Sequence, residues 1–253
     1  MPRLRARAQI IAQDGGLIVE RDPLRHSGRL LRQDDMEASY IDLADPSHLE
    51  FDYLRWIRIV LRAARSRSIL HVGGGACALP RALAAEDPDL RQAVCEVDPA
   101  VLALAREHLG LRRTRGLRVR QVDGREFIAG QADSSWDAVV VDAFVGAVVP
   151  RRLITVQALR DVARVAPLAL VNLIDNRSAR LVHETAATLA EAYAQVWALG
   201  SRVGNRVLVG CALRLDFERI AAEAAADRSP ARLVAPHAIV RSIAGTPPAR
   251  DLE

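Results

Sequence analysis

The stretch that decides the fold is residues 68–77, which read Ser-Ile-Leu-His-Val-Gly-Gly-Gly-Ala-Cys. The apolar run Ile69–Val72 leads directly into Gly73, Gly74 and Gly75, and a helical pattern follows at once. Glycines permit a tight turn and let a ligand approach the backbone closely, facing the positive end of the next helix. On its own, this turn fits a nucleoside site and a simple tight turn equally well.

Outward from this turn, short apolar runs alternate with helical stretches. Such alternation predicts an α/β protein in which helices cover both faces of a doubly wound, mostly parallel sheet. The expected strands are Ile69–Val72, Ala93–Val97, Leu117–Val122, Ala138–Val141 and Leu168–Ile174. The expected helices are Ala78–Ala85, Ala100–Leu109, Arg151–Val165 and Ala179–Ala194.

Two further strands are expected near Gln195–Leu199 and Arg206–Leu213. The connection Gly200–Asn205 is too short for a crossover helix, so the two strands must be antiparallel. A parallel sheet that ends in an antiparallel hairpin is typical of methyltransferase-type folds. We therefore expect a seven-stranded sheet of that type, mostly parallel with its last strand antiparallel.

The two ends of the chain differ from this core. Short extended segments at Leu17–Glu20, Arg29–Arg32 and Ala38–Leu43 predict a small N-terminal antiparallel β-sheet region. Ser47–Arg65 shows helical spacing, with Ser47 as its expected cap. After the core, a helix at Asp216–Ala225 and irregular chain are expected. The predicted division is 1–50, 51–215 and 216–253.

Composition narrows the class of protein. Half of the 253 residues are apolar, and no apolar run reaches the roughly 20 residues of a membrane helix, which argues against a membrane protein. Three scattered cysteines argue against a disulfide framework and a zinc site, and favour a reducing cytoplasm. The net charge of +4 is weak evidence for nucleic acid, and six arginines between 112 and 125 fit a solvated face better.

Acidic residues end three successive strands of the predicted sheet. Glu96 lies about 20 residues after the glycines, where an acid accepts hydrogen bonds from both ribose hydroxyls of a nucleoside. Asp98 is better explained as a helix cap. Asp123 and Asp142 end the next two strands, and parallel strands present their carboxyl ends at one edge. The predicted site is a nucleoside pocket beside negative charge, which suits a cationic ligand such as a sulfonium nucleoside.

Four segments in order resemble the successive motifs of spermidine synthases and related aminopropyltransferases. They are Val72–Gly75, Cys95–Pro99, Val122–Phe127 and Trp136–Ala143. The resemblance extends over about Asp34–Leu213. It implies an N-terminal β-sheet region, a methyltransferase-like core, and assembly into dimers or tetramers, of which we expect a homodimer here.

The resemblance also implies roles for individual residues. Glu96 would hold the ribose, Asp123 the adenine amino group and Asp142 the attacking amine, with Tyr53 on the substrate side. Asp175 is a substrate-side candidate from its position alone, because it ends the fifth strand and could supply a replacement acid there. Asp175 fits a helix cap equally well. The nucleoside site would comprise Gly73, Gly74, Gly75, Glu96, Val97, Asp123, Gly124 and Ala143.

Two departures concern the amine side of the site. The family's glycine loop continues with an acid that binds the aminopropyl ammonium, and here that residue is Ala76. A second acid usually follows three residues after the catalytic one, and here it is Val145. The nucleoside half of the predicted site is therefore intact, whereas the polyamine half is altered and the activity is in question.

The leading hypothesis is a cytoplasmic transferase that moves the aminopropyl group of decarboxylated S-adenosylmethionine to an amine such as putrescine. It needs no metal and no permanently bound cofactor. An ordinary carboxylate is a poor base for an ammonium, so Asp142 is expected to act mainly by positioning the amine. The alternatives are a methyltransferase that uses S-adenosylmethionine, and a non-catalytic nucleoside-binding protein on the same fold.

Overall fold

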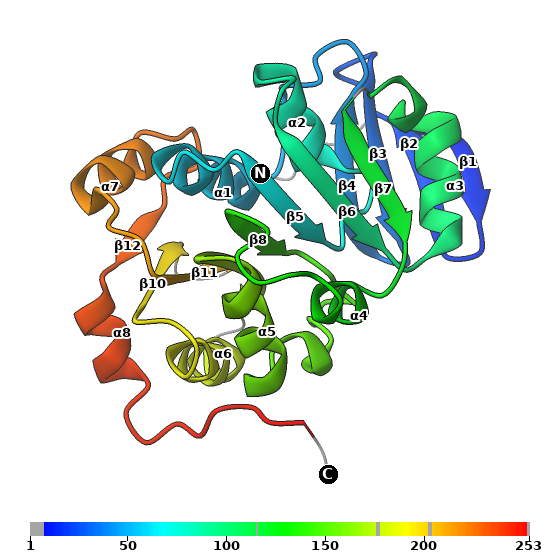
Figure 1. The fold of residues 1–253 in the computed structure, drawn as a ribbon. Helices are drawn as coiled ribbons and strands as arrows, with labels where there is room; N and C mark the ends of the chain where they lie inside the picture. The colour runs from blue at the N-terminus through cyan, green and yellow to red at the C-terminus, as the bar shows by residue number, and fades with distance from the viewer. Residues whose placement is uncertain (1–7, 115, 176–177, 202–203, 252–253) are drawn as a thin grey trace.

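The fold is built around one eight-stranded sheet, seen in a computed structural model that describes residues 8–114, 116–175, 178–201 and 204–251 (Figure 1). The strands lie in the order β12-β10-β11-β9-β8-β5-β6-β7. Their bounds are β5 Ser68–Val72, β6 Arg91–Glu96, β7 Leu117–Gln121, β8 Ala138–Val141, β9 Leu168–Asp175, β10 Gln195–Gly200, β11 Gly204–Cys211 and β12 Arg232–Val234.

Strand directions confirm the predicted architecture. Strands β5 to β9 pair in parallel, and β11 runs antiparallel to both β9 and β10. The connection between β10 and β11 lies partly outside the described residues, at 202–203. The expected number of seven strands is wrong by one, because the tail adds β12 beside β10.

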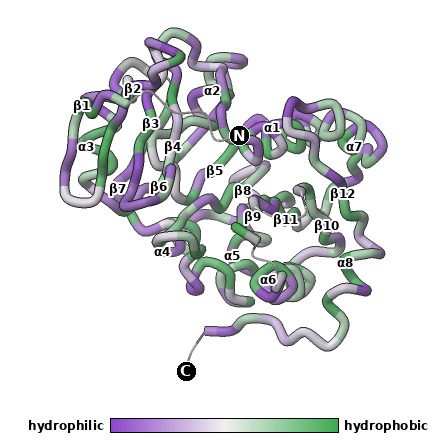
Figure 2. Tube along the Cα trace, turned by 180° about the vertical axis from the view of Figure 1, so that it is seen from behind, coloured by the Kyte–Doolittle hydropathy of each residue, from purple (hydrophilic) through white to green (hydrophobic). Residues whose placement is uncertain are grey.

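Two layers of helices cover the sheet, each over its own apolar cluster. One face carries α1 (Asp52–Ala63), α2 (Ala78–Glu86), α3 (Pro99–His108) and α7 (Phe217–Ala225). The other carries α4 (Gly124–Ala129), α5 (Val156–Val165), α6 (Arg180–Ala190) and α8 (Pro236–Ser242). Short 3-10 helices η1 (Leu111–Arg113) and η2 (Arg151–Leu153) complete the order. Helices α1 and α7 alternate hydrophilic and hydrophobic segments, as amphipathic helices do (Figure 2).

The N-terminal sheet is an antiparallel meander of four strands. Its strands are β1 (Gln9–Asp14), β2 (Leu17–Arg21), β3 (Gly28–Gln33) and β4 (Met36–Asp42), and they pair in chain order. The three predicted segments are confirmed as β2, β3 and β4. Strand β1 was not predicted, because it is mostly exposed and lacks a clear alternation of apolar and polar residues. The sheet packs against α3 through β1 and β2, and against α2 through β4.

Helix α1 begins later than its pattern predicts. Its N-cap position is Phe51, which makes no side-chain cap, and the Ser47 hydroxyl instead donates to Asp45 Oδ1 at 2.6 Å. The predicted Ser47 cap is therefore wrong. The helical spacing begins before the helix itself because Leu49 is buried in the same core from the preceding turn.

The tail is more ordered than the sequence predicts. The expected helix is present as α7, capped by Asp216, whose side chain accepts from the Arg219 N–H at 3.0 Å. The expected irregular chain after it is wrong, because β12 extends the central sheet and α8 packs against β10. The boundaries at residues 50 and 215 stay a prediction.

Candidate functional site

The glycine turn lies at the carboxyl edge of the central sheet, between β5 and α2. Gly73 has a φ of +75°, and a Cβ built on it would lie 2.5 Å from the carbonyl oxygen of Asp142 and 2.7 Å from Ala143. Any side chain there would collide with backbone, so only glycine lets β5 and β8 approach so closely at this edge. The loop then enters α2 at Cys77, which is itself left-handed with a φ of 60°.

Glu96 ends β6 and supports the glycine turn directly. Its two carboxylate oxygens accept from the backbone N–H of Gly75 at 3.2 Å and of Asp98 at 3.0 Å. The side chain is buried, and this burial raises its pKa although the backbone N–H groups oppose the shift. Asp98 caps α3 by accepting from Ala100 and Val101, as the sequence predicts. A carboxylate has about four acceptor sites, so Glu96 keeps capacity for a ligand.

Asp142 follows β8 and is held by two donors from distant elements. Tyr53 of α1 donates its hydroxyl to Asp142 Oδ2 at 3.1 Å, and Asn172 of β9 donates to Oδ1 at 2.9 Å. Burial raises the pKa of the Asp142 carboxyl, and the two hydrogen bonds only partly oppose the shift. This carboxyl is therefore a better proton acceptor than the ordinary aspartate assumed from the sequence.

A cavity connects these groups. It lies between the sheet, α1, α2 and the N-terminal sheet, on the face that carries α1 and α2. Tyr53, Asp142 and the backbone of the three glycines contribute polar groups to its wall, and most of the other lining side chains are apolar. Its remaining lining residues are Ala38, Ser39, Leu54, His71, Ala78, Leu79, Pro80, Val140 and Phe144.

Asp123 lies outside this cavity and already has partners. It caps α4 by accepting from the N–H groups of Arg125 and Glu126, and it forms an ion pair with Arg152 of η2. Gly124, the first residue of α4, is buried so tightly that a Cβ would lie 2.3 Å from a Val72 methyl group. An adenine amino group would have to share Asp123 with Arg152.

The other predicted residues are distributed around the same edge. Val97 is 66% exposed in the loop after β6, and Ala143 is half-buried beside Gly73. Asp175 ends β9, paired in register with Gly204, and its side chain lies outside the described part of the structure. The structure thus gathers Tyr53, Asp142 and the glycines at one cavity, with Glu96 joined to it through Gly75.

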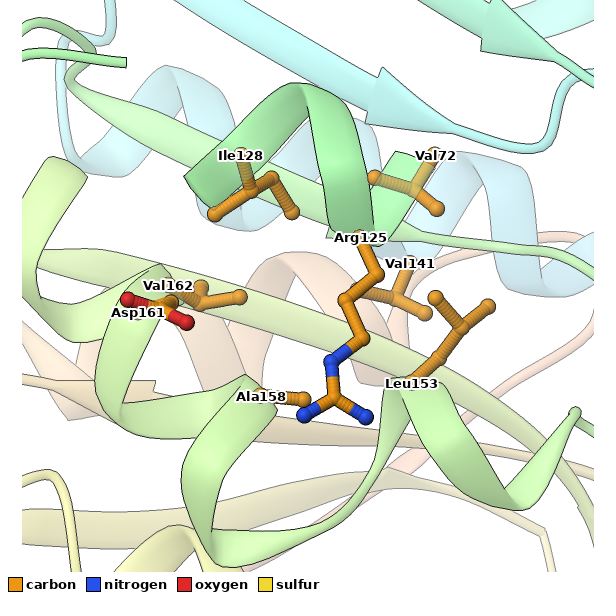
Figure 3. Close-up of a pocket in the computed structure, with 8 residues that line it drawn as sticks. All are labelled: Val72, Arg125, Ile128, Val141, Leu153, Ala158, Asp161 and Val162. Carbon is orange, nitrogen blue, oxygen red and sulfur yellow. The ribbon is translucent and has the colours of Figure 1, made fainter. Parts of the chain in front are cut away.

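A second cavity lies on the opposite face of the sheet, beneath α4 and α5 (Figure 3). Apolar side chains such as Val72, Val141 and Val162 form its walls, and Arg125 extends across its mouth. The Arg125 guanidinium forms an ion pair with Asp251 near the end of the described chain, and it donates to the carbonyl of Arg152. This space is a packing gap beneath the C-terminal segment rather than part of the candidate site.

Metal binding, membrane insertion and nucleic-acid binding are other properties for which this chain can be compared with its structure. Within the described ranges, no three or more His, Cys, Asp or Glu side chains gather to hold a metal ion, and the three cysteines are free and buried. Among the same residues, no helix has both the length and the apolar character needed to cross a membrane. The arginines at 118 and 120 lie exposed on the edge strand β7, and residue 115 lies outside the described chain.

Sequence reasoning missed two polar residues of this region, His71 and Asn172. Both lie inside apolar strands, with side chains on the same sheet face as Asp142, and both are nearly fully buried. A signal was present, because His71 and Asn172 are each the single polar residue within the apolar runs Ile69–Val72 and Leu168–Ile174. A buried polar side chain in such a strand needs a partner, and a site is one place to find it.

Comparisons with known proteins agree with the motifs. No model of a protein family matches the chain. A polyamine aminopropyltransferase of Vibrio vulnificus (strain CMCP6) is 25% identical over 166 residues, which cover 62% of this chain. The match spans 56% of that relative's length.

Solved structures match over most of the chain. A probable spermidine synthase from Corynebacterium glutamicum ATCC 13032 has a TM-score of 0.86 at 25% identity, covering 96% of both chains. A spermidine synthase solved with the transition-state analogue AdoDATO has a TM-score of 0.64 at 14% identity, covering 93% of this chain and 85% of that one, and shows the shared fold. In sequence and in fold, the chain is therefore similar to the spermidine synthases and related aminopropyltransferases, as its four motifs predict.

Proposed function

We propose that this protein is an aminopropyltransferase that moves the aminopropyl group of decarboxylated S-adenosylmethionine to a small amine. The observation that carries the proposal is the Asp142 carboxyl, held by Tyr53 and Asn172 and facing a cavity that begins at the glycine turn. A carboxylate fixed from two sides can orient an amine without moving itself, which lowers the entropy cost of the reaction.

The proposed reaction is a single displacement at carbon. The amine nitrogen uses its lone pair to form a bond to the methylene carbon next to the sulfonium. The carbon–sulfur bond breaks, its electron pair stays on sulfur, and neutral 5'-methylthioadenosine leaves. The amine must first give up a proton, and Asp142 is placed to take it because burial raises the pKa of its carboxyl. Asp142 then passes this proton to solvent, and the restored carboxylate stabilises the positive charge that forms on the product nitrogen.

Glu96 and the glycine turn are proposed to hold the nucleoside. The Glu96 carboxylate would accept from both ribose hydroxyls while its bond to the Gly75 N–H keeps the turn in place. Because Glu96 is buried, these charge-assisted hydrogen bonds form away from water and are strong.

The direct test incubates the purified protein with decarboxylated S-adenosylmethionine and a panel of small amines, and measures methylthioadenosine by chromatography. We expect release that depends on both the amine and Asp142, with Asp142→Asn as the control. If no amine releases methylthioadenosine, the proposal is wrong, and a nucleoside-binding protein without this activity becomes the better description.

Methyl transfer from S-adenosylmethionine is the second candidate. The observation that favours it is Ala76, which is fully buried and apolar at the position where the resemblance predicts an acid. Such an acid would repel the carboxylate of S-adenosylmethionine, so its loss relaxes discrimination between the two nucleosides. Calorimetry with both ligands separates the candidates, because tighter binding of the decarboxylated form counts against methyl transfer. Assembly as a homodimer and a cytoplasmic location stay predictions.

A further inference from the structure

The lining of the cavity includes an unused polar group, His71. It lies on β5 two residues before Gly73, lines the same cavity as Asp142 and Tyr53, and is only 2% exposed. The proposed reaction assigns it no role. In the β5–β8 register His71 is opposite Val140, and Asp142 lies two residues further along on the same face. Strand spacing and rise place the two backbones about 8 Å apart, within reach of one short ligand.

The hydrogen bonds of His71 fix which ring nitrogen carries its proton. Gln92 donates its amide N–H to the carbonyl oxygen of Pro80 at 2.9 Å, so its amide oxygen must face His71. That oxygen lies 3.0 Å from His71 Nε2, which therefore carries the proton. Burial lowers the pKa of His71 to about 4, so the ring is neutral at pH 7. Its Nδ1 is then a pure acceptor, and no donor among the described residues reaches it.

The cavity also has few charged groups in its lining. Asp142 is the one carboxylate among its lining residues in the described chain. Val145, where the resemblance predicts a second acid, is 73% exposed and is not among those lining residues. The aminopropyl donor brings an ammonium of its own to the glycine loop, so a dication would add two more positive charges, one at Asp142 and the other near a neutral imidazole with no opposite charge. An unpaired buried charge is strongly unfavourable.

We propose that His71 makes this cavity specific for amines with a single cationic nitrogen, which binds at Asp142, and an uncharged hydrogen-bond donor, such as a hydroxyl, which binds at His71 Nδ1. The inference rests on the proposed aminopropyl transfer and names the class of its acceptor, an amino alcohol or similar monocation in place of a diamine. It differs from a purely structural role, in which His71 would only link β5 to α2 through Gln92.

The test compares three amines of equal chain length: 4-amino-1-butanol, 1-butylamine and 1,4-diaminobutane. For the unchanged protein we expect kcat/KM to be about 2- to 10-fold higher for the amino alcohol than for butylamine, as one net hydrogen bond provides. The diamine should be the poorest of the three. If the diamine is the best substrate, the inference is overturned while the proposed function stands.

Variants of His71 test whether the preference for the amino alcohol depends on this residue. His71→Phe should abolish the advantage of the amino alcohol and leave butylamine nearly unchanged, whereas His71→Asp should shift the preference toward the diamine. His183→Phe, on α6 across the sheet, is the matched control and should change neither ratio. An unchanged preference in folded His71→Phe contradicts the proposal.

A measurement on the unchanged protein covers the case in which these variants do not fold or no amine reacts. The ¹⁵N resonance of His71 Nδ1 should shift when 4-amino-1-butanol is added with methylthioadenosine present, and stay in place with butylamine. A structural histidine would respond to neither. No shift with the amino alcohol overturns the inference, whatever the outcome for turnover.

Discussion

At the scale of single residues, Asp142 combines two properties that conflict. It is a carboxylate that must ionise to bind a cationic amine, and its surroundings disfavour that charge, so its pKa is raised. Groups of this kind commonly lower stability and serve function. The Tyr53 and Asn172 hydrogen bonds keep the carboxylate in one orientation despite this cost.

Asp142→Asn removes the charge of this side chain and keeps its shape and its hydrogen bonds. The amide is isosteric, can still accept from Asn172, and can donate to the Tyr53 oxygen, so the fold should persist. We expect turnover to fall by at least about 100-fold, because the proton acceptor and the opposite charge are both lost. Chromatographic measurement of methylthioadenosine checks this, with the exposed Asp133→Asn as control. Turnover retained in Asp142→Asn would exclude Asp142 from the reaction.

The same variant predicts a pH dependence of stability. The folded protein binds a proton at Asp142 at a higher pH than the unfolded chain does. The contribution of this group to the free energy of unfolding therefore rises as the pH falls from neutrality toward about 3.9. Asp142→Asn lacks this titration. In urea unfolding, the variant should have the higher free energy of unfolding at pH 7, and its difference from the unchanged protein should be smaller at pH 5. A difference that is larger at pH 5 would contradict the raised pKa.

Glu96 gives the second prediction at this scale. Glu96→Gln should weaken binding of methylthioadenosine by roughly 1.5–3 kcal/mol, because a charged acceptor for two ribose hydroxyls becomes a neutral amide. Titration calorimetry measures the dissociation constant, with the exposed Glu107→Gln as the matched control. An unchanged dissociation constant would mean that the nucleoside binds elsewhere.

Much of the candidate site could be predicted from single residues. Acids at successive strand ends meet at one edge because the strands are parallel, so Glu96, Asp123 and Asp142 followed from the pattern alone. The residues that surround Asp142 did not follow from the pattern. Tyr53 was assigned only through the family resemblance, and Asn172 and His71 are positioned by strand register, which a sequence does not contain.

At the scale of elements, the short helix η2 brings Arg152 to Asp123. Sequence periodicity merged this segment with α5 into one helix, Arg151–Val165. The chain instead breaks at Ile154 and restarts at Thr155, whose Oγ1 caps α5 by accepting from Ala158 at 3.3 Å. The break matters because it places Arg152 over the carboxyl edge of the sheet.

Arg152→Gln tests whether η2 controls the adenine site. The Arg152 side chain is 52% exposed, and exposed ion pairs contribute up to about 1 kcal/mol. If adenine competes for Asp123, removing the arginine should tighten methylthioadenosine binding by up to about 5-fold. Arg151→Gln is the control, since Arg151 pairs with Glu184 instead. Weaker binding in Arg152→Gln would mean that the arginine contacts the ligand itself.

At the scale of the whole molecule, the tail is an integral part of the core. Strand β12 extends the sheet at β10, α7 packs on α1, and the last described residues reach α5, where the Val156 N–H donates to the carbonyl of Ala249 at 2.8 Å. These contacts join segments far apart in the chain, and for that reason local periodicity predicted α7 and missed β12 and α8.

A buried ion pair fastens this tail to α1. Arg55 is 6% exposed and binds the Asp227 carboxylate through Nε and Nη2 at 2.9–3.0 Å, while its Nη1 donates to the carbonyls of Leu49 and Glu50. Burial raises the pKa of Asp227, but the hydrogen bonds from Arg55 and the Ser229 N–H, together with the positive charges of Arg55 and Arg228, outweigh burial, so the net pKa is lowered. Because α1 also carries Tyr53, this pair stabilises the helix that holds Asp142.

Asp227→Asn should therefore destabilise the whole molecule. The amide carries no negative charge, so the buried Arg55 guanidinium loses its oppositely charged partner. We expect the free energy of unfolding to fall by about 3 kcal/mol. Since the folded pKa of Asp227 is lowered, its contribution is present at neutral pH and is lost as the pH falls below about 4, so the difference between variant and unchanged protein should shrink in acid. Urea unfolding at pH 7 and at about pH 3 measures both effects. The exposed Asp133→Asn should show neither, and a difference that grows in acid would place the origin of the effect outside the Arg55–Asp227 pair.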